Sequence, residues 1–314
     1  MKSGNQKRNN QIKGGFKLWN PHLLGPDCLG WFQSNTLSGS SGATLSTWHD
    51  FGRQDAATGA GTEAPSVTDP QTDFKFRQST FFDSTLDQHF TIGQSSNDPY
   101  DVGTGDFMVT AMTKGPFDGL SPDPNPIFGN GSALDAGSRF DLSCQYYAPA
   151  NVGIGGESQV LIKTELGNPN SNDKVENVGG ISFDGVNNIA GASSMGPDYE
   201  GGTITCGILV TAKRKSGVLT THVNGVQIGG STNAAGYTGS DVDLTNAFPA
   251  TIGQNTFFEG VILRHYDGSI FEVVVSTDAE DDTQDKVEGY LAFKYGRQED
   301  LISTHTYKNA PPFA

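Results

Sequence analysis

Carboxylate side chains are the first candidates for chemistry in this sequence, because a pair of Asp or Glu residues can cleave a glycosidic bond. In a retaining glycosidase the two carboxyl groups lie about 5 to 5.5 Å apart, and a run such as Glu-x-Asp-x-x-Glu on one strand would supply such a pair. No run of this kind occurs. Glu272 stands alone in the segment FEVVV, and Asp198 and Glu200 flank Tyr199 among glycines. We therefore predict no glycosidase activity.

Nucleophilic and nucleotide chemistry have no better basis in the sequence. There is no Gly-x-Ser-x-Gly elbow and no phosphate-binding loop of the Walker type. The glycines of residues 153–156 lack the strand-turn-helix setting of a dinucleotide site. The histidines occur in unrelated contexts, at His22, His49, His89, His222, His265 and His305. We predict that the protein is not an enzyme and needs no cofactor.

Calcium is the metal that the acidic loops could bind, since it prefers oxygen ligands. Asp98, Asp101 and Asp106 cluster in one turn-rich segment, and Asp118 and Asp123 lie in another. Neither segment has the spacing of an EF-hand loop. The first three aspartates are calcium candidates, and the alternative is that they are solvated turn residues.

Sugar binding requires an aromatic platform beside polar side chains or backbone groups. Tyr147, next to Tyr146, and also Tyr199 and Tyr237 lie in or next to glycine-rich segments that could provide one. They are the candidate glycan contacts. The alternative is that these tyrosines are interface residues or are partly buried in the core.

The charge of the chain is distributed unevenly. The first 17 residues form a basic arm without acidic residues, and its charged side chains are Lys2, Lys7, Arg8, Lys13 and Lys17. Because these are five of the 20 basic residues, the rest of the chain carries 15 basic against 35 acidic residues, a net charge of −20. Such a body repels nucleic acids and anionic membranes. We expect the arm to attach the protein to a neighbouring subunit, and the alternative is a solubilising tail.

Length and composition predict one large all-β domain behind this arm. The 314 residues include 41 glycines and 15 prolines, and only 18% are charged, as expected for many short strands joined by turns. No apolar run reaches the roughly 20 residues that span a bilayer, and we expect neither a signal peptide nor membrane association. Cys28, Cys144 and Cys206 are far apart and odd in number, so we expect reduced thiols.

Alternating apolar residues predict the strands. Residues 107–112 are typical of a central strand, as are residues 270–275, and Asn224-Gly225 predicts a tight hairpin between residues 219–223 and 226–228. Residues 74–77 also alternate. Residues 115–137 contain four prolines and are expected to leave the sheets, because proline removes ladder donors. Two packed antiparallel sheets are the predicted solution.

One helix is expected near the C-terminus, at about residues 278–295. Thr277 and Glu280 have the spacing of a capping box, and Gly296 is placed for a left-handed C-terminal cap. An apolar stripe along the helix includes the lysine stem and consists of Val287, Tyr290, Leu291 and Lys294. We predict that this helix closes an edge of the β-structure.

The C-terminal residues VEGYLAFKYG, followed by HTYKNAPP, resemble the end of concanavalin A-like, LamG-type sandwich domains of bacterial surface proteins and phage virion proteins. The segments LWNPHLLGPDCLGWFQSNT, STWHDFG, FKFRQSTFFDSTLDQHFTIG and VLTTHVNGVQIGG agree in the expected order, from about Leu18 to Pro312. This chain departs from the family with Tyr295 in place of Trp and Phe293 in place of His. The resemblance implies a concanavalin A-like jelly roll over residues 18–314, in which Trp31 and Trp48 are core residues and Glu272 makes structural hydrogen bonds.

The resemblance and the basic arm together predict a non-enzymatic structural protein of a virus particle: a phage capsid decoration, fibre or tail-appendage subunit. Such a subunit would be made in the host cytoplasm, would contact other capsid or tail proteins, and would form a homo-oligomer. The alternative is a glycan-binding adhesion module, extracellular or on a cell surface, that recognises host or cell-surface carbohydrate.

Overall fold

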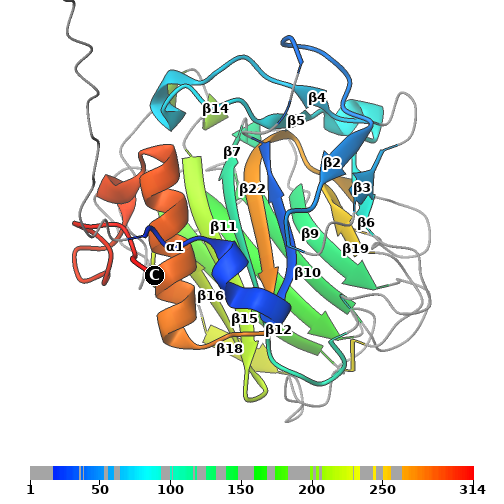
Figure 1. The fold of residues 1–314 in the computed structure, drawn as a ribbon. Coiled ribbons are helices and arrows are strands. Elements are labelled where there is room, and N and C mark those ends of the chain that lie inside the picture. The colour runs from blue at the N-terminus through cyan, green and yellow to red at the C-terminus, as the bar shows by residue number, and fades with distance from the viewer. Residues whose placement is uncertain are drawn as a thin grey trace, which may run out of the picture.

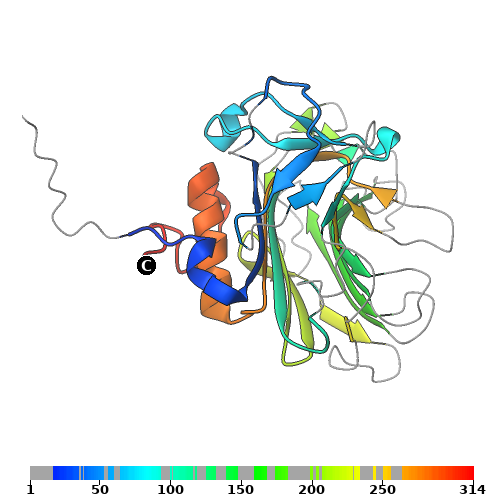
Figure 2. The same ribbon diagram turned by 45° about the vertical axis from the view of Figure 1, so that its right-hand side comes forward.

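The molecule has three layers. The computed structural model describes residues 17–34, 37, 39–52, 56–59, 64–92, 100, 102–115, 117–118, 125–131, 139–147, 159–167, 174–182, 199–200, 203–204, 207–228, 230–233, 243–244, 250–255 and 264–314. Within these residues two antiparallel β-sheets lie face to face, and one α-helix, α1 (Asp281–Tyr295), lies against the outer face of one sheet (Figure 1, Figure 2). The prediction of a two-sheet antiparallel sandwich with a C-terminal helix is confirmed.

The sheet next to the helix has eight strands in the described chain. Their order in space is β17-β16-β15-β7-β22-β5-β4, and β1 also pairs with β22. The strands are β1 (Cys28–Gln33), β4 (Ser66–Val67), β5 (Thr80–Phe82), β7 (Phe107–Lys114), β15 (Gly207–Lys215), β16 (Val218–Val223), β17 (Val226–Ile228) and β22 (Gly268–Ser276).

The second sheet has nine described strands, in the order β18-β12-β11-β10-β9-β19-β6-β3-β2. They are β2 (Thr47–His49), β3 (Ala56–Thr58), β6 (Phe90–Ile92), β9 (Asn125–Gly131), β10 (Arg139–Tyr147), β11 (Gln159–Gly167), β12 (Lys174–Ser182), β18 (Gly230–Asn233) and β19 (Ala250–Ile252). Smaller sheets join β8 (Phe117–Asp118), β13 (Tyr199–Glu200) and β14 (Thr203–Ile204), and join β20 (Gln254–Asn255) to β21 (Arg264–His265). The described residues also include four short 3-10 helices: η1 (Pro21–Asp27), η4 (Thr72–Phe74), η5 (Ser84–Leu86) and η8 (Gln298–Asp300).

The eight-stranded sheet is covered on both faces, and this explains the composition of β22. Ile270 and Val273 face the core between the two sheets, whereas Phe271 and Val274 face the core under the helix. A strand with two buried faces reads as a continuous apolar run instead of an alternating one. Each such side chain contributes about 1.5 to 3 kcal/mol when it is fully buried.

Several local predictions are confirmed. Residues 107–112 lie in β7, between β15 and β22. Asn224 and Gly225 have φ values of 51° and 81°, as the tight hairpin between β16 and β17 requires. Gly296 ends α1 with φ 75°, in the left-handed region. Both Trp31 and Trp48 are buried.

The prediction that residues 115–137 leave the sheets is wrong for Asn125–Gly131, which form β9 in the interior of the nine-stranded sheet. Pro126 is tolerated because it lies near the start of the strand, where the ladder with β10 has a bulge. The neighbour on the other side, β19, pairs only with Phe128 and Gly129. The proline therefore removes no donor from a ladder on that side.

Residues 74–77 do not form a strand. Phe74 ends η4, and Lys75 and Phe76 have positive φ values of 51° and 58°. The alternation in the sequence has a different cause, since Phe74 is buried against the helix-side core whereas the side chain of Phe76 is 71% exposed.

The helix start and the placement of the helix also differ from the prediction. Thr277 is not a cap, since α1 begins at Asp281 and the capping residue Glu280 makes no side-chain cap hydrogen bond. Instead, an oxygen of Asp278 accepts the backbone N–H of Glu280 at 3.1 Å. The helix covers the face of the sheet over β7, β15 and β22 and does not close an edge. No helix among the described residues is both long and apolar enough to cross a membrane.

Candidate functional site

A polar groove lies between the outer face of strands β15 to β17 and the first half of α1. It is open to solvent and has a volume of about 500 Å³. Its lining residues are Lys213, Lys215, Ser216, Val218, Thr220, His222, Gly225, Gln227, Asp281, Gln284 and Asp285. This set, which includes ammonium, hydroxyl, amide, imidazole and carboxylate groups, is called the polar groove below.

The alternation of side chains along β16 determines which of its residues form the floor of the polar groove. In β16, Leu219 and Val223 point into the core between the sheets, and the hydroxyl of Thr221 meets that of Thr164 at 2.7 Å. The intervening residues Thr220 and His222 therefore face outwards, towards the helix side. The sheet is wider than the helix, so α1 leaves part of the outer face of β15 to β17 uncovered, and this part is the floor of the polar groove (Figure 1).

Ion pairs join the floor of the groove to the helix. The ammonium of Lys213 donates to Oδ1 of Asp281 at 2.5 Å, and that of Lys215 donates to Glu280 at 2.7 Å. The Lys213 side chain is only 6% exposed, whereas that of Asp281 is 82% exposed. The hydrogen bond from Lys213 and its positive charge lower the pKa of Asp281, which keeps this carboxylate ionised.

A buried carboxylate, that of Glu288, is hydrogen-bonded to the groove residue Gln284. Glu288 is fully buried, and it accepts a hydrogen bond from Gln284 at 2.9 Å and one from Nε2 of His305 at 3.2 Å. Burial alone would raise its pKa. The hydrogen bonds from His305, Thr211 and Gln284, together with the nearby His222, outweigh burial and hold the pKa below its ordinary value. Burial also lowers the pKa of His222, which favours its neutral form.

Asp285, Glu288 and His305 have donor atoms within 4.8 Å of one another and could in principle hold a metal ion. The tautomer of His305 argues against this. Its Nδ1 accepts the backbone N–H of Tyr307 at 3.1 Å, so the proton of the neutral ring lies on Nε2, the atom that faces both carboxylates. A protonated nitrogen donates a hydrogen bond and cannot bind a cation. These three residues therefore dock the C-terminal tail onto the helix.

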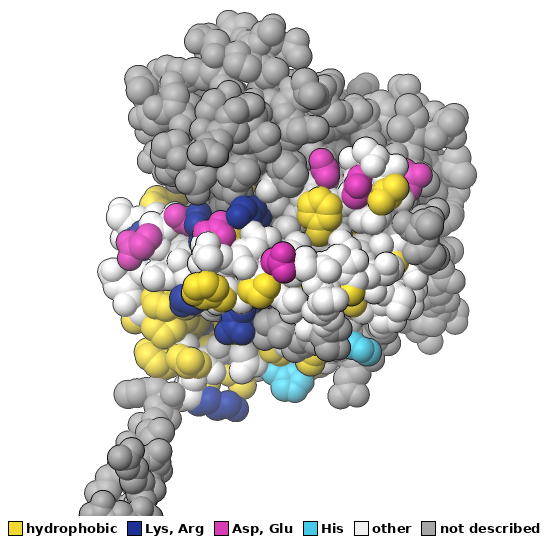
Figure 3. Space-filling view, turned by 90° about the horizontal axis from the view of Figure 1, so that it is seen from above, with side chains coloured by type: hydrophobic (Ala, Val, Ile, Leu, Met, Phe, Trp, Pro, Cys, Tyr) yellow, Lys and Arg dark blue, Asp and Glu magenta, His cyan; other side chains and the backbone are white. Residues whose placement is uncertain are grey.

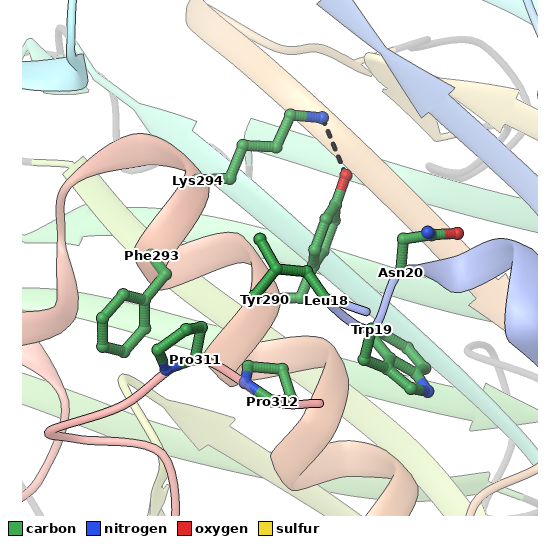
Figure 4. A pocket seen from close by; sticks show the side chains of 8 residues that line it. All are labelled: Leu18, Trp19, Asn20, Tyr290, Phe293, Lys294, Pro311 and Pro312. Carbon is green, nitrogen blue, oxygen red and sulfur yellow. Dashed lines mark hydrogen bonds between the residues drawn. The ribbon is translucent and has the colours of Figure 1, made fainter. Parts of the chain in front are cut away.

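An apolar groove of about 400 Å³ lies where the two ends of the described chain meet (Figure 4). The backbone N–H of Trp19 donates to Pro312 at 3.0 Å, and that of Ala314 donates to Lys17 at 2.8 Å. The apolar groove is lined by Leu18, Trp19, Asn20, Tyr290, Phe293, Lys294, Pro311 and Pro312.

The charge of Lys294, which lines the apolar groove, is already neutralised. Its ammonium donates to Glu272 at 2.5 Å, to Gln33 at 2.8 Å and to the hydroxyl of Tyr290 at 2.9 Å. Glu272 also accepts hydrogen bonds from Trp31 and Tyr295, each at 2.6 Å. The structural hydrogen bonding expected for Glu272 is confirmed. Burial lowers the pKa of Lys294 and raises those of Tyr290 and Tyr295.

The structure describes only some of the arm residues and of the calcium candidates. Lys17 is exposed, and the other arm residues (Lys2, Lys7, Arg8 and Lys13) lie outside the described residues. Oδ1 of Asp106 accepts the backbone N–H of Ser216 at 2.8 Å, which is the role of a turn residue. Asp98 and Asp101 lie outside the described residues.

The structure describes the backbone of only two of the three candidate glycan tyrosines. Tyr147 ends β10 in the nine-stranded sheet, and Tyr199 begins β13 in a separate small sheet. Their side chains and the whole of Tyr237 lie outside the described residues. Sequence reasoning missed the polar groove, although the outward positions of β15 and β16 carry a visible signal in Lys213, Lys215, Thr220 and His222.

Comparison with known proteins adds similarity at the level of the fold. No protein-family model matches the sequence, and no curated protein matches it. The CBM40 of the Ruminococcus gnavus IT-sialidase, solved with α2,6-sialyllactose, is 16% identical over 60% of this chain and 86% of that chain, with a TM-score of 0.39. Trypanosoma rangeli sialidase in complex with 2,3-difluorosialic acid is 14% identical over 88% of this chain and 34% of that chain, with a TM-score of 0.39.

A third solved structure, described as HCR/D-Sa-GBL1/C, is 13% identical over 83% of this chain and 51% of that chain, with a TM-score of 0.48. This chain thus spans about a third of the Trypanosoma sialidase and about half of the third structure. At these identities, and with TM-scores below 0.5, the similarities assign neither a ligand nor an activity to this chain.

Proposed function

We propose that this protein is a non-catalytic glycan-binding module and that the polar groove is its binding site. The observation that carries the proposal is the lining of the groove. Its volume of about 500 Å³ falls within the roughly 300 to 1,000 Å³ of small-molecule sites. A saccharide presents hydroxyls that both donate and accept hydrogen bonds, and the groove offers matching groups of both kinds.

The non-catalytic part of the proposal rests on how the groove carboxylates are bound. Asp281 is paired with Lys213 and its pKa is lowered, so it is a poor proton donor near neutral pH. Asp285 accepts a hydrogen bond from the hydroxyl of Thr306 at 2.5 Å. Val218, 56% exposed at the rim, offers an apolar contact to the C–H face of a sugar ring.

A glycan array tests this function. The full chain is expected to bind a defined set of saccharides, and Thr220→Ala and Gln227→Ala in the groove should each weaken that binding at least about tenfold, a change of roughly 1.4 kcal/mol. Thr44→Ala, at an exposed position that does not line the groove, is the matched control. An array without binding, or binding that both groove variants leave unchanged, contradicts the proposal.

A second candidate function, subunit of a virus particle or another large assembly, is favoured by a different observation. The root of the basic arm is held on the body by the pairing of Lys17 to Trp19 with the C-terminal residues. Leu18 and Phe313 form an isolated antiparallel bridge there, and their side chains remain 56% and 45% exposed. Exposed large apolar residues next to an apolar groove are typical of an interface.

In Figure 3 hydrophobic side chains gather at one side of the described surface, with Lys and Arg side chains beside them. Assembly through the basic arm and its root, Lys17 to Trp19, is tested by native mass spectrometry and co-sedimentation. Three proteins are compared: the full chain, a variant lacking residues 1–14, and Leu18→Asp. Loss of assembly in both variants supports the role of the arm and its root. A full chain that stays monomeric and binds no particle contradicts it.

A further inference from the structure

We infer that the polar groove selects uncharged saccharides and that Asp281 is the residue that determines this selectivity. The inference rests on the proposed glycan-binding function and adds the class of ligand. It follows from how the charges of the groove are paired and from which partner of each pair faces the solvent.

The charge of Lys213 lies deep in the groove, and in both ion pairs of the groove the carboxylate is the more exposed partner. Lys213, 6% exposed, is paired with Asp281, which is 82% exposed. Lys215, 31% exposed, is paired with Glu280, which is 68% exposed, and lies 3.7 Å from Asp281. An incoming ligand therefore meets carboxylates before it meets ammonium groups.

The remaining groups of the groove do not reverse this order. Asp285 adds a carboxylate with 36% exposure. His222, whose neutral form is favoured by burial, adds no positive charge near neutral pH. The first turn of α1 would attract an anion through its free backbone N–H groups, but Asp281, the acidic residue of that turn which lines the groove, already occupies that end of the helix.

An uncharged saccharide meets no such obstacle. Its hydroxyls can donate to the outward-facing oxygens of Asp281 and Asp285 and can accept from the amide of Gln227. A saccharide that carries a carboxylate or sulfate would instead face like charge at the mouth, and the ammonium groups that would attract it are already hydrogen-bonded.

The test compares pairs of immobilised saccharides that share one core, where one member is uncharged and the other carries an added sialic acid or sulfate. The wild-type chain is expected to bind the uncharged member at least about tenfold more tightly. Asp281→Asn, which unmasks Lys213, should reduce this preference at least fivefold. Asp281→Glu keeps the charge and should retain the preference, which separates loss of charge from loss of folding.

Asp282→Asn is the matched control, because Asp282 lies in the same helical turn but pairs with Lys286 and does not line the groove. The double variant Asp281→Asn, Lys213→Met should lose the anion binding that Asp281→Asn gains. Tighter wild-type binding to the charged members, or an Asp281→Asn preference equal to that of the wild type, overturns the inference and leaves glycan binding intact. An array on which the wild type binds no saccharide overturns the proposed function, and the inference with it.

Discussion

The ammonium of Lys294 on α1 lies 2.5 Å from a carboxylate oxygen of Glu272 on β22, and the Glu272 side chain has no exposed surface. This pair joins the helix to the central part of the eight-stranded sheet. The ammonium also lies 5.9 Å from the ring centroid of Trp31 and 5.4 Å from that of Tyr295. The charge is thus enclosed by aromatic rings and neutralised by one carboxylate, and this favours one position of the helix on the sheet.

Lys294→Met is expected to lower the free energy of unfolding by about 3 to 5 kcal/mol, because it leaves the buried carboxylate of Glu272 without its cation. Chemical denaturation measures this change. Lys286→Met removes the partner of Asp282, whose side chain is 70% exposed, and should change stability by no more than about 1 kcal/mol. Equal losses of stability in the two variants would show that the buried pair contributes no more to the free energy of unfolding than the exposed pair.

Gly225→Ala tests the contact between the β16–β17 hairpin and the C-terminal tail. A Cβ at this position would lie 2.6 Å from Cδ2 of His305, and the residue has φ +81°. Gly42→Ala is the matched control, since Gly42 has φ +78° but no atom within 4 Å of the added Cβ. We expect Gly225→Ala to cost about 1 to 3 kcal/mol more than Gly42→Ala in thermal or chemical unfolding. Similar losses of stability in the two variants would show that the C-terminal tail accommodates the added methyl group without a measurable loss of free energy.

Stability should fall as the solution is acidified. The pKa of His222 is lowered in the fold, so its contribution is present above the ordinary histidine pKa of 6.5 and is lost as the pH falls through the lower native value. The pKa of Glu288 is also lowered, and its contribution is lost as the pH falls below the ordinary value of 4.5 and through the lower native value. Unfolding measured between pH 8 and pH 3 should therefore show two successive declines.

His222→Gln should flatten the decline that begins near pH 6.5, and Glu288→Gln should flatten the decline at lower pH. Each variant serves as the control for the other. Stability that rises between pH 7 and pH 5.5 would contradict the assignment to His222.

Local sequence patterns were sufficient wherever neighbouring residues decide the conformation. The Asn224-Gly225 turn, the Gly296 cap and the strand at residues 107–112 depend on backbone preference and side-chain alternation, and all three are confirmed. The predictions are wrong where the conformation depends on contacts with residues that are distant in the sequence. Pro126 enters a sheet interior because β19 pairs with other residues of β9. Phe74 lies in η4, where its ring stacks on that of Phe271 with 4.0 Å between the ring centroids.

The sequence by itself determined the antiparallel sandwich, because many short alternating segments separated by glycine and proline can bury their apolar faces only in packed sheets. It also determined the helix near the C-terminus. The polar groove was decided only by the tertiary structure. Lys213 and Asp281 are 68 residues apart and become partners because the helix packs on the outer face of a sheet that is wider than the helix. Outward polar residues look alike in a sequence whether they face bulk water or a groove, and only the packing of α1 distinguishes the two.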